Sequence, residues 1–367
     1  MPKAKETVLE IDLGALTHNF NYLKSKIQPN TKFLAVVKAF AYGSDITTIA
    51  KHLETLKVDY FAVAYCAEGV ALRDAGITTP ILVLHPQPVN FKTIINRCLE
   101  PSVYSERLLR EFITAAKAEK QVHYPVHLKF NTGLNRLGFK RDDLEIIAKH
   151  FSSTSSVYCK SIFSHLAASE ASEERLFTEQ QILEFQGLYD ACQKFLDDAP
   201  IKHLCNTSGV LNYPKAHYDM VRCGIGLYGF GNSATFDAHL KPVARLKSVI
   251  SQIHQVHAGD TVGYNRAYKA SREERIATIP IGHADGINRS FGHGKGYVFI
   301  NEKKASIVGN VCMDMIMVNV SNIDCKEGDE VIVFNGKHKA STLAESAHTI
   351  SYEILTAISQ RIKRQLL

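Results

Sequence analysis

A lysine that follows an apolar run is the first residue whose type and setting suggest chemistry. The stretch AVVKAFAYG, residues 35–43, places Lys38 where a buried strand would end, and Tyr42 and Gly43 follow it. A partly apolar environment disfavours the ammonium form of lysine, and the neutral amine can then form a Schiff base with a carbonyl compound. The ordinary alternative is a strand-end lysine whose charged head reaches solvent.

Polar residues also follow later apolar runs, and each has an ordinary explanation when taken alone. Asn206 would cap a helix, and His165 would be a hydrogen-bonded core histidine. Backbone N–H groups near Thr207 and Gly224 suit a phosphate, and a ligand with both a phosphate and a carbonyl suggests pyridoxal phosphate. The residues that would share one rim are Lys129, Arg136, His165, Asn206, Thr207, Arg222, Gly224 and Ile225.

The elements that must position these residues are apolar, β-branched runs separated by helix-periodic segments such as DITTIAKHLETL and ERLLREFITAAKAEK. This alternation predicts a (β/α)8 barrel over residues 1–235, with its chemistry at the carboxyl ends of the strands. The fourth run is the weakest, and its loss would favour an open doubly wound sheet. The expected strands are 33–38, 60–65, 81–85, 101–105, 126–130, 161–166, 202–207 and 221–228.

Beyond residue 235 the pattern changes to short strands joined by Gly, Asn and Asp turns, as in RIATIPIGH and DEVIVFNG. Residues 236–367 are therefore predicted to form a second, mostly β domain. A first strand at about 5–13 is a candidate to pair with it. A last helix is expected over 342–366, interrupted around 350–352.

Composition excludes several classes of protein. Of the 367 residues, 45% are hydrophobic and 22% charged, and no apolar run is long enough to span a bilayer. The net charge of +6 is scattered among acids, which argues against nucleic acid as a partner. The eight cysteines show no C-x-x-C pair or zinc spacing, so we expect neither disulfides nor a metal site. The start lacks the hydrophobic core of a signal peptide, so a cytoplasmic location is expected.

Nine ordered motifs resemble the alanine racemase family and extend over nearly the whole chain. They are VVKAFAYG, LKFNTGLNRLG, IFSHLA, NTSG, VRCGIGLYG, VGYNRAY, PIGHADG, GNVCMDM and TISYE. Each alone is weak evidence, but nine in order make a chance match very improbable. The resemblance implies a pyridoxal-phosphate enzyme that interconverts L- and D-alanine. It also implies a homodimer in which the partner chain completes each site.

The resemblance further implies roles for single residues. Lys38 would hold the cofactor and act as a base on one face of the substrate, and Tyr264 would act on the opposite face from the other subunit. Arg222 would contact the pyridine nitrogen, supported by His165. Cofactor contacts would also include Tyr42, Asn206, Thr207, Gly224, Ile225 and Tyr352. Substrate contacts would include Arg136, Met313 and Asp314.

Several positions depart from the family pattern. Asn131 stands where relatives usually have Asp, His283 where they have Tyr, and Asn310 where they have Arg. The last two belong to the entrance corridor in relatives, so we predict a corridor of altered charge and looser substrate selection. Lys129, which relatives can carry as a carbamate, is kept.

Other functions fit these residues less well. A non-catalytic pyridoxal-phosphate-binding protein would lack the β domain and Tyr264. A related decarboxylase would share the two-domain plan, but TISYE and the tyrosine base fit it badly. A cofactor-free Schiff-base aldolase would explain Lys38 but not Arg222. A racemase of broader or different amino-acid specificity is the main alternative. Supply of D-alanine for peptidoglycan is implied by the resemblance alone.

Overall fold

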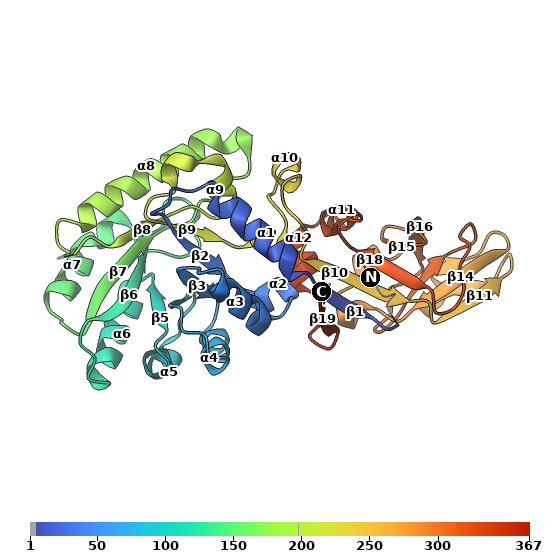
Figure 1. Ribbon diagram of the computed structural model, residues 1–367, viewed down its shortest axis with the longest axis horizontal. Coiled ribbons are helices and arrows are strands. Elements are labelled where there is room, and N and C mark those ends of the chain that lie inside the picture. Colours follow the sequence, from blue (N-terminus) through green and yellow to red (C-terminus); the bar gives the residue numbers. More distant parts are fainter. Residues whose placement is uncertain (1–4, 197) are drawn as a thin grey trace. The chain divides into compact units, whose positions relative to one another are not determined.

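The computed structural model describes residues 5–196 and 198–367, which form two compact units (Figure 1). One is a barrel built from Thr17–Ala41 and Ile46–Leu240. The other is mostly β and contains the residues up to Leu16, Tyr42–Asp45 and Lys241–Leu367. The predicted fold class, a (β/α)8 barrel followed by a mostly β region, is confirmed. Within the described ranges, none of the helices has the length and apolar character needed to cross a membrane.

Strands that follow one another in the chain are neighbours all the way around the barrel, and the last strand pairs with the first. All these pairings are parallel, so every strand ends at the same rim. The eight strands are β2 (Lys32–Val36), β3 (Tyr60–Val63), β4 (Ile81–Val83), β5 (Glu100–Val103), β6 (Tyr124–Lys129), β7 (Val157–Phe163), β8 (Ile201–His203) and β9 (Met220–Cys223).

The strand expected to be weakest is present as β5. It pairs with β4, where Glu100 lies opposite Leu82, and with β6, where Val103 lies opposite Leu128. Pro101 cannot donate a backbone hydrogen bond, which weakens the local strand signal. Two neighbouring strands nevertheless hold the segment in place, so the barrel is closed and the open-sheet alternative is wrong.

Helices surround the barrel, and α6 shows why they form. Ser105 caps it by accepting a hydrogen bond from the Leu108 backbone N–H at 3.3 Å. Leu108, Leu109 and Phe112 are buried at helical spacing, so one apolar face packs on the strands. The helices are α1 (Leu13–Lys24), α2 (Lys38–Gly43), α3 (Ile46–Thr55), α4 (Cys66–Asp74), α5 (Phe91–Asn96), α6 (Glu106–Ala118), α7 (Leu144–Ser152), α8 (Arg175–Cys192), α9 (Thr207–Asn212) and α10 (Ala234–Asp237).

The β unit is built on a nine-stranded sheet in the order β11-β14-β17-β16-β15-β18-β10-β1-β19. Strand β1 (Val8–Ile11) lies between β10, to which it is antiparallel, and β19, to which it is parallel. The other strands are β10 (Ala244–Val249), β11 (Gln252–Val256), β14 (Glu274–Ile279), β15 (Tyr297–Ile300), β16 (Lys303–Val308), β17 (Ile316–Asn319), β18 (Glu330–Phe334) and β19 (Lys363–Leu366). A separate two-stranded pairing joins β12 (Thr261–Val262) to β13 (Tyr268–Lys269).

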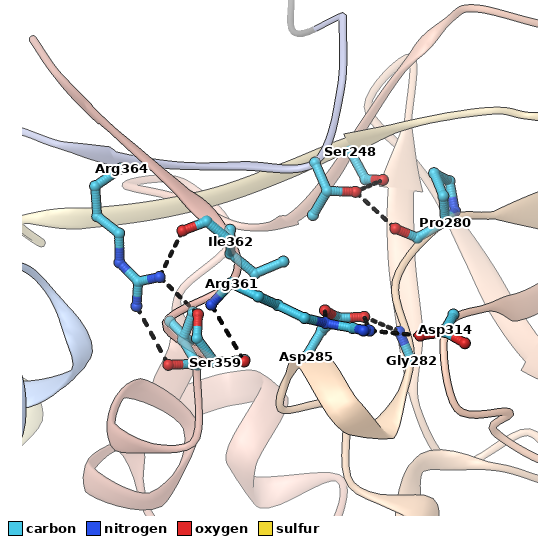
Figure 2. A network of polar contacts seen from close by, with 11 residues as sticks. Ser248, Pro280, Gly282, Asp285, Asp314, Ser359, Arg361, Ile362 and Arg364 are labelled. Carbon is cyan, nitrogen blue, oxygen red and sulfur yellow. Dashed lines mark hydrogen bonds and ion pairs between the residues drawn. The ribbon is translucent and has the colours of Figure 1, made fainter.

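The end of the chain corrects one prediction. Helices α11 (Ala340–Glu345) and α12 (Ser351–Thr356) occupy the first part of the expected terminal helix, but residues 363–366 form β19. Pairing of this segment with β1 satisfies its backbone, and the Arg364 guanidinium donates to the carbonyls of Ser359 and Ile362 (Figure 2). These tertiary contacts override the local helical pattern.

Candidate active site

Lys38 begins a turn with an unusual backbone. Ala39, Phe40, Ala41 and Tyr42 have φ angles of 53–55°, so this short helix is left-handed. Each residue in that conformation costs about 1–2 kcal/mol, and the conformation persists only where the surroundings enforce it. Such strain is often found at functional sites.

Contacts at each end of this turn hold it in place. The Ala39 N–H donates to the Glu68 carboxylate at 2.6 Å, within the barrel unit. Gly43 has a φ of 79°, and a Cβ there would lie 1.8 Å from the Leu355 carbonyl oxygen, within the β unit. Arg364 also donates to the Gly43 carbonyl at 2.9 Å. The position therefore requires glycine.

The barrel rim is strongly cationic. Burial lowers the pKa of Lys38, and the positive charge of Arg136 lowers it further, while Glu68 opposes both effects. Burial, Arg136 and Arg222 lower the pKa of Lys129 to about 8. Burial and the same cations hold the pKa of His165 well below its usual value. Lys38 is thus shifted towards a neutral amine amid charges that would attract an anion.

Arg222 projects from β9 and is 4% exposed. Its guanidinium donates to the carbonyls of Ser164 at 2.7 Å and Leu204 at 2.9 Å, and to Nδ1 of His203 at 3.0 Å and of His165 at 3.3 Å. None of these four acceptors is a carboxylate. Nη1 donates to His203, and the two hydrogens of Nη2 are shared among the other three acceptors. Within the described residues, Nε–H is therefore left to donate to a ligand.

Thr207 and the glycines after β9 lie together. The Thr207 hydroxyl accepts from the N–H groups of Gly224 at 3.2 Å and Gly226 at 3.3 Å. Since the hydroxyl accepts twice, its own proton can be donated to an anion. A Cβ on Gly226 would lie 2.6 Å from the Thr207 methyl group, so only glycine fits. Ile225 begins the one-turn helix Ile225–Tyr228 that follows.

Asn206 has the structural role that the sequence left open. Its side-chain oxygen caps α9 by accepting from the Gly209 N–H at 2.8 Å, and it also accepts from the Ser169 hydroxyl. Capping places Thr207 at the start of the helix. Any direct contact between Asn206 and a cofactor stays a prediction.

Arg136 is exposed and lies in the loop after β6. Asn131 organises this loop, because its side-chain oxygen accepts from the N–H groups of Gly133 at 3.2 Å and Asn135 at 2.9 Å. Its amide nitrogen donates to the Asn135 side chain at 2.8 Å. Asn131 therefore provides the acceptor that an aspartate would provide, and the departure at this position preserves the turn.

In the β unit, Tyr264, Met313 and Asp314 line one pocket of about 450 Å³. Tyr264 is 73% exposed and Met313 is 59% exposed. The turn that carries Tyr264 is left-handed at Gly263, Asn265 and Arg266, with φ of 76°, 57° and 51°. This unit thus holds a second, open group of predicted site residues.

Two contacts fix this pocket. The Asn310 amide donates to the Tyr264 carbonyl at 3.1 Å. The Arg361 guanidinium forms a two-point ion pair with buried Asp285, at 2.6 and 3.0 Å, and donates to Asp314 at 2.6 Å (Figure 2). Arg361 therefore links the pocket wall to a buried carboxylate.

Tyr42 and Tyr352 both belong to the β unit, and their ring centroids are 6.1 Å apart. Tyr352 is the second residue of α12. His283 lines a different pocket of about 420 Å³. Its backbone N–H donates to the Cys312 carbonyl at 2.9 Å. The predicted corridor residue is therefore tied to the loop between β16 and β17 that also carries Met313.

Similarity to known proteins covers both units. Residues 11–231 match the family model described as alanine racemase, N-terminal domain, and residues 243–366 match that described as alanine racemase, C-terminal domain. An alanine racemase of Halothermothrix orenii is 36% identical, covering 98% of this chain and 97% of that relative. An alanine racemase of Desulfovibrio desulfuricans is 33% identical, covering 97% of this chain and 96% of that relative.

The chain belongs to the alanine racemase family. This is a family of isomerases. The solved structure of alanine racemase from Clostridium difficile 630 has a TM-score of 0.91 and 34% identity, covering 100% of this chain and 97% of that one. That of alanine racemase from Bacillus anthracis with bound L-Ala-P also has a TM-score of 0.91, at 30% identity and coverage of 100% and 96%.

Sequence reasoning missed two groups of residues that support this alanine racemase family site. Arg361 was not singled out, although it lies in the same terminal segment as the motif TISYE. The polar residues that continue inward from Arg222 were also missed. They are Glu100, His127, Ser161 and His203. The available signal was a polar residue within or at the end of each of four consecutive barrel strands.

Proposed function

We propose that this protein interconverts L- and D-alanine, with pyridoxal phosphate bound to Lys38 as its cofactor. The observation that carries the proposal is a half-buried lysine of lowered pKa on a cationic barrel rim, next to an arginine that is not paired with a carboxylate, in a chain of this family. When bound, pyridoxal phosphate serves as the electron sink that makes the substrate Cα proton acidic.

The residues present fit this group. The lowered pKa of Lys38 favours the neutral amine that covalent attachment needs. The Thr207 hydroxyl can donate to the phosphate, and the two glycines of Gly224-Ile225-Gly226 carry no side chain that would keep a phosphate from the backbone. By the family resemblance we assign Tyr42 and Tyr352 to the same phosphate; their ring centroids lie 6.1 Å apart.

Arg222 would face the pyridine nitrogen through its Nε–H. Burial lowers the pKa of Arg222 only to about 10, so at neutral pH the guanidinium keeps its proton and the ring nitrogen stays unprotonated. A ring without that proton withdraws electrons less strongly. The site would therefore favour return of the proton to Cα, which is racemisation, over transamination.

Racemisation needs one group to remove the Cα proton and another to deliver a proton from the opposite face. We assign these roles to Lys38 and to Tyr264 of the partner subunit. The exposure of Tyr264 and Met313 in the single chain supports a homodimer, because a second copy would cover the open pocket and exclude water from it. Arg136, Met313 and Asp314 would then contact the substrate.

A racemase of broader or different specificity is the second candidate, and Asn310 and His283 favour it. Both replace larger residues usual in the family's corridor. Supply of D-alanine for peptidoglycan, in the cytoplasm, follows from family membership rather than from any contact in the structure.

The test is formation of D-alanine from L-alanine by the purified protein with pyridoxal phosphate, beside Lys38→Ala and Tyr264→Phe. We expect activity in the wild type and its collapse in both variants. Absence of D-alanine in a wild-type protein that still binds the cofactor through Lys38 would contradict alanine as substrate. The same assay with a panel of amino acids would then decide for the second candidate.

A further inference from the structure

The interior of the barrel is divided between two kinds of side chain. Strands β2, β3 and β4 contribute buried Leu34, Tyr60, Ala62 and Leu82, which pack against Met220 of β9. The Tyr60 hydroxyl also hydrogen-bonds to Glu100, so this side chain contacts both parts of the interior. The other interior strands carry a continuous series of polar contacts, one residue from each. In strand order from β9 to β5 these are Arg222, His203, Ser161, His127 and Glu100.

Every link in this series is short. His203 Nε2 lies 2.8 Å from the Ser161 hydroxyl, which lies 2.6 Å from Nδ1 of His127. Nε2 of His127 lies 2.6 Å from the Glu100 carboxylate. The two histidines and Ser161 are fully buried. Buried polar groups of this kind are stable only when each donor meets an acceptor.

The chemistry of the end groups fixes the direction of the series. Arginine can only donate, so Nδ1 of His203 must accept and its ring proton must be on Nε2. That proton is donated to Ser161, whose own proton can then go only to Nδ1 of His127. His127 in turn carries its proton on Nε2 and donates it to the Glu100 carboxylate.

Both histidines must be neutral for this order to hold. Burial and the positive charge of Arg222 hold the pKa of His203 well below its usual value. If His127 were charged, its Nδ1–H would donate to Ser161, and the serine proton would then have no acceptor in the series. The Phe163 ring stacks on His203 with centroids 4.8 Å apart, which restricts rotation of the imidazole.

We propose that Glu100 is a positioning residue for Arg222, acting through an ordered hydrogen-bond series that crosses the barrel interior. The series supplies a negative end to a buried guanidinium that has no carboxylate next to it, because each bond polarises the following one. It fixes His203 as an acceptor and so fixes the orientation of Arg222. The consequence for catalysis rests on the proposed function, since there Arg222 faces the pyridine nitrogen.

The ring protons give a direct test that does not depend on turnover. Protein labelled with ¹⁵N-histidine and loaded with pyridoxal phosphate is examined by NMR, with signals assigned through their loss in His127→Asn and His203→Asn. We expect both rings to be neutral, with the proton on Nε2. If the wild-type protein shows a charged ring or a proton on Nδ1 in either histidine, that result overturns the proposal without any variant.

Two substitutions then test transmission along the series. Glu100→Gln keeps an acceptor and should preserve both tautomers, whereas Glu100→Leu removes it and should change the His203 signals and the absorbance of the bound cofactor. If Glu100→Leu does not fold, Ser161→Ala is used in its place, because it interrupts the same hydrogen-bond series. Glu106→Leu is the control, because Glu106 contacts His150 at 3.1 Å outside the barrel interior.

Kinetics separate positioning from simple structural support. In Glu100→Leu we expect kcat to fall by about tenfold with little change in KM, which is the size of one lost hydrogen bond to a charged group. Unchanged His203 signals in this variant would refute the proposal. Correct tautomers in a protein that makes no D-alanine would instead refute alanine racemisation and leave the hydrogen-bond series intact.

Discussion

Lys38 and Tyr264 are the two residues assigned to proton transfer, and the structure holds them in contrasting ways. Lys38 lies in a barrel rim whose neighbours Lys129 and Arg222 are buried, and Lys129, Arg222 and His165 all have lowered pKa values. Tyr264 is exposed on a left-handed turn, held by a hydrogen bond from Asn310. One half of the site is shaped by desolvation, and the other by polar contacts at the surface.

This difference indicates what each half can do in a single chain. The barrel half already has the burial and charge that tune a lysine and orient an arginine. The β half has a pocket and a fixed turn, but it lacks a cover that would exclude water. Under the proposed function, cofactor binding would need only the single chain, whereas catalysis would need the proposed homodimer.

The largest effect should come from breaking the buried half at Arg222. Arg222→Met leaves the carbonyls of Ser164 and Leu204 and Nδ1 of His203 without a donor, and buried polar atoms without partners are costly. We expect the free energy of unfolding to fall by about 3–5 kcal/mol, measured by urea denaturation. Arg141→Met, which removes an exposed arginine paired with Glu184, is the control. A loss no larger than that of the control would show that the hydrogen bonds donated by Arg222 do not stabilise the barrel.

Lys129 tests the electrostatic side of the same half. Its pKa is about 8 in the folded protein and about 10.5 in the unfolded chain, so between these pH values the unfolded state binds more protons and stability rises with pH. Below about pH 8 the buried charge costs about 3 kcal/mol. Lys129→Met removes that cost, so its stability relative to wild type should be higher at pH 7 than at pH 10.5. Urea denaturation at the two pH values measures this, and a pH-independent difference would show that Lys129 does not titrate with a lowered pKa in the folded protein.

The barrel was predictable because each strand and helix carries its own local pattern. Pro101 weakens the local strand signal of β5, but pairing with the two neighbouring strands is enough to fix its position. The terminal strand β19 was not predictable, since its pairing with β1 joins residues at opposite ends of the chain. Strand ends converge on one rim in any parallel barrel, so Lys38 and Arg222 could be brought together from sequence.

Other features of the site depend on three-dimensional register and left little local signal. The left-handed turn after Lys38 contains alanine, phenylalanine and tyrosine rather than glycine or asparagine, so nothing in residues 39–42 indicates it. Arg361 contacts Asp285 and Asp314, which are 76 and 47 residues away. Such contacts follow from the folded sheet and not from spacing in the sequence.

In the exposed half, Arg361→Lys should have a smaller effect than the barrel substitutions. Lysine is a point charge and cannot hold the Asp285 carboxylate at two points while also reaching Asp314. The wall that carries Met313 should loosen, and we expect kcat/KM for alanine to fall by about tenfold with little change in stability. Steady-state kinetics measure this against Arg175→Lys, which alters the exposed pair with Glu179. Equal kinetics in the two variants would contradict a role for Arg361 in the pocket.

The smallest effect should come from Asn310→Ala, which removes one hydrogen bond to the turn that carries Tyr264. An exposed hydrogen bond contributes about 1 kcal/mol, so we expect kcat to fall by about fivefold. Asn335→Ala is the matched control, because Asn335 stabilises a different loop of the same unit through the N–H groups of Lys337 and His338.

The same position tests whether the departure from the family affects selectivity as well as geometry. Asn310→Arg restores the usual family residue, which is larger and carries a charge. If Asn310 widens the entrance, wild type should racemise larger amino acids at rates comparable to alanine, and Asn310→Arg should reduce those rates more than the rate for alanine. Activity confined to alanine in both proteins would show that Asn310 only holds the Tyr264 turn. The exposed half would then differ from the barrel half in how it is held, and not in which substrates it admits.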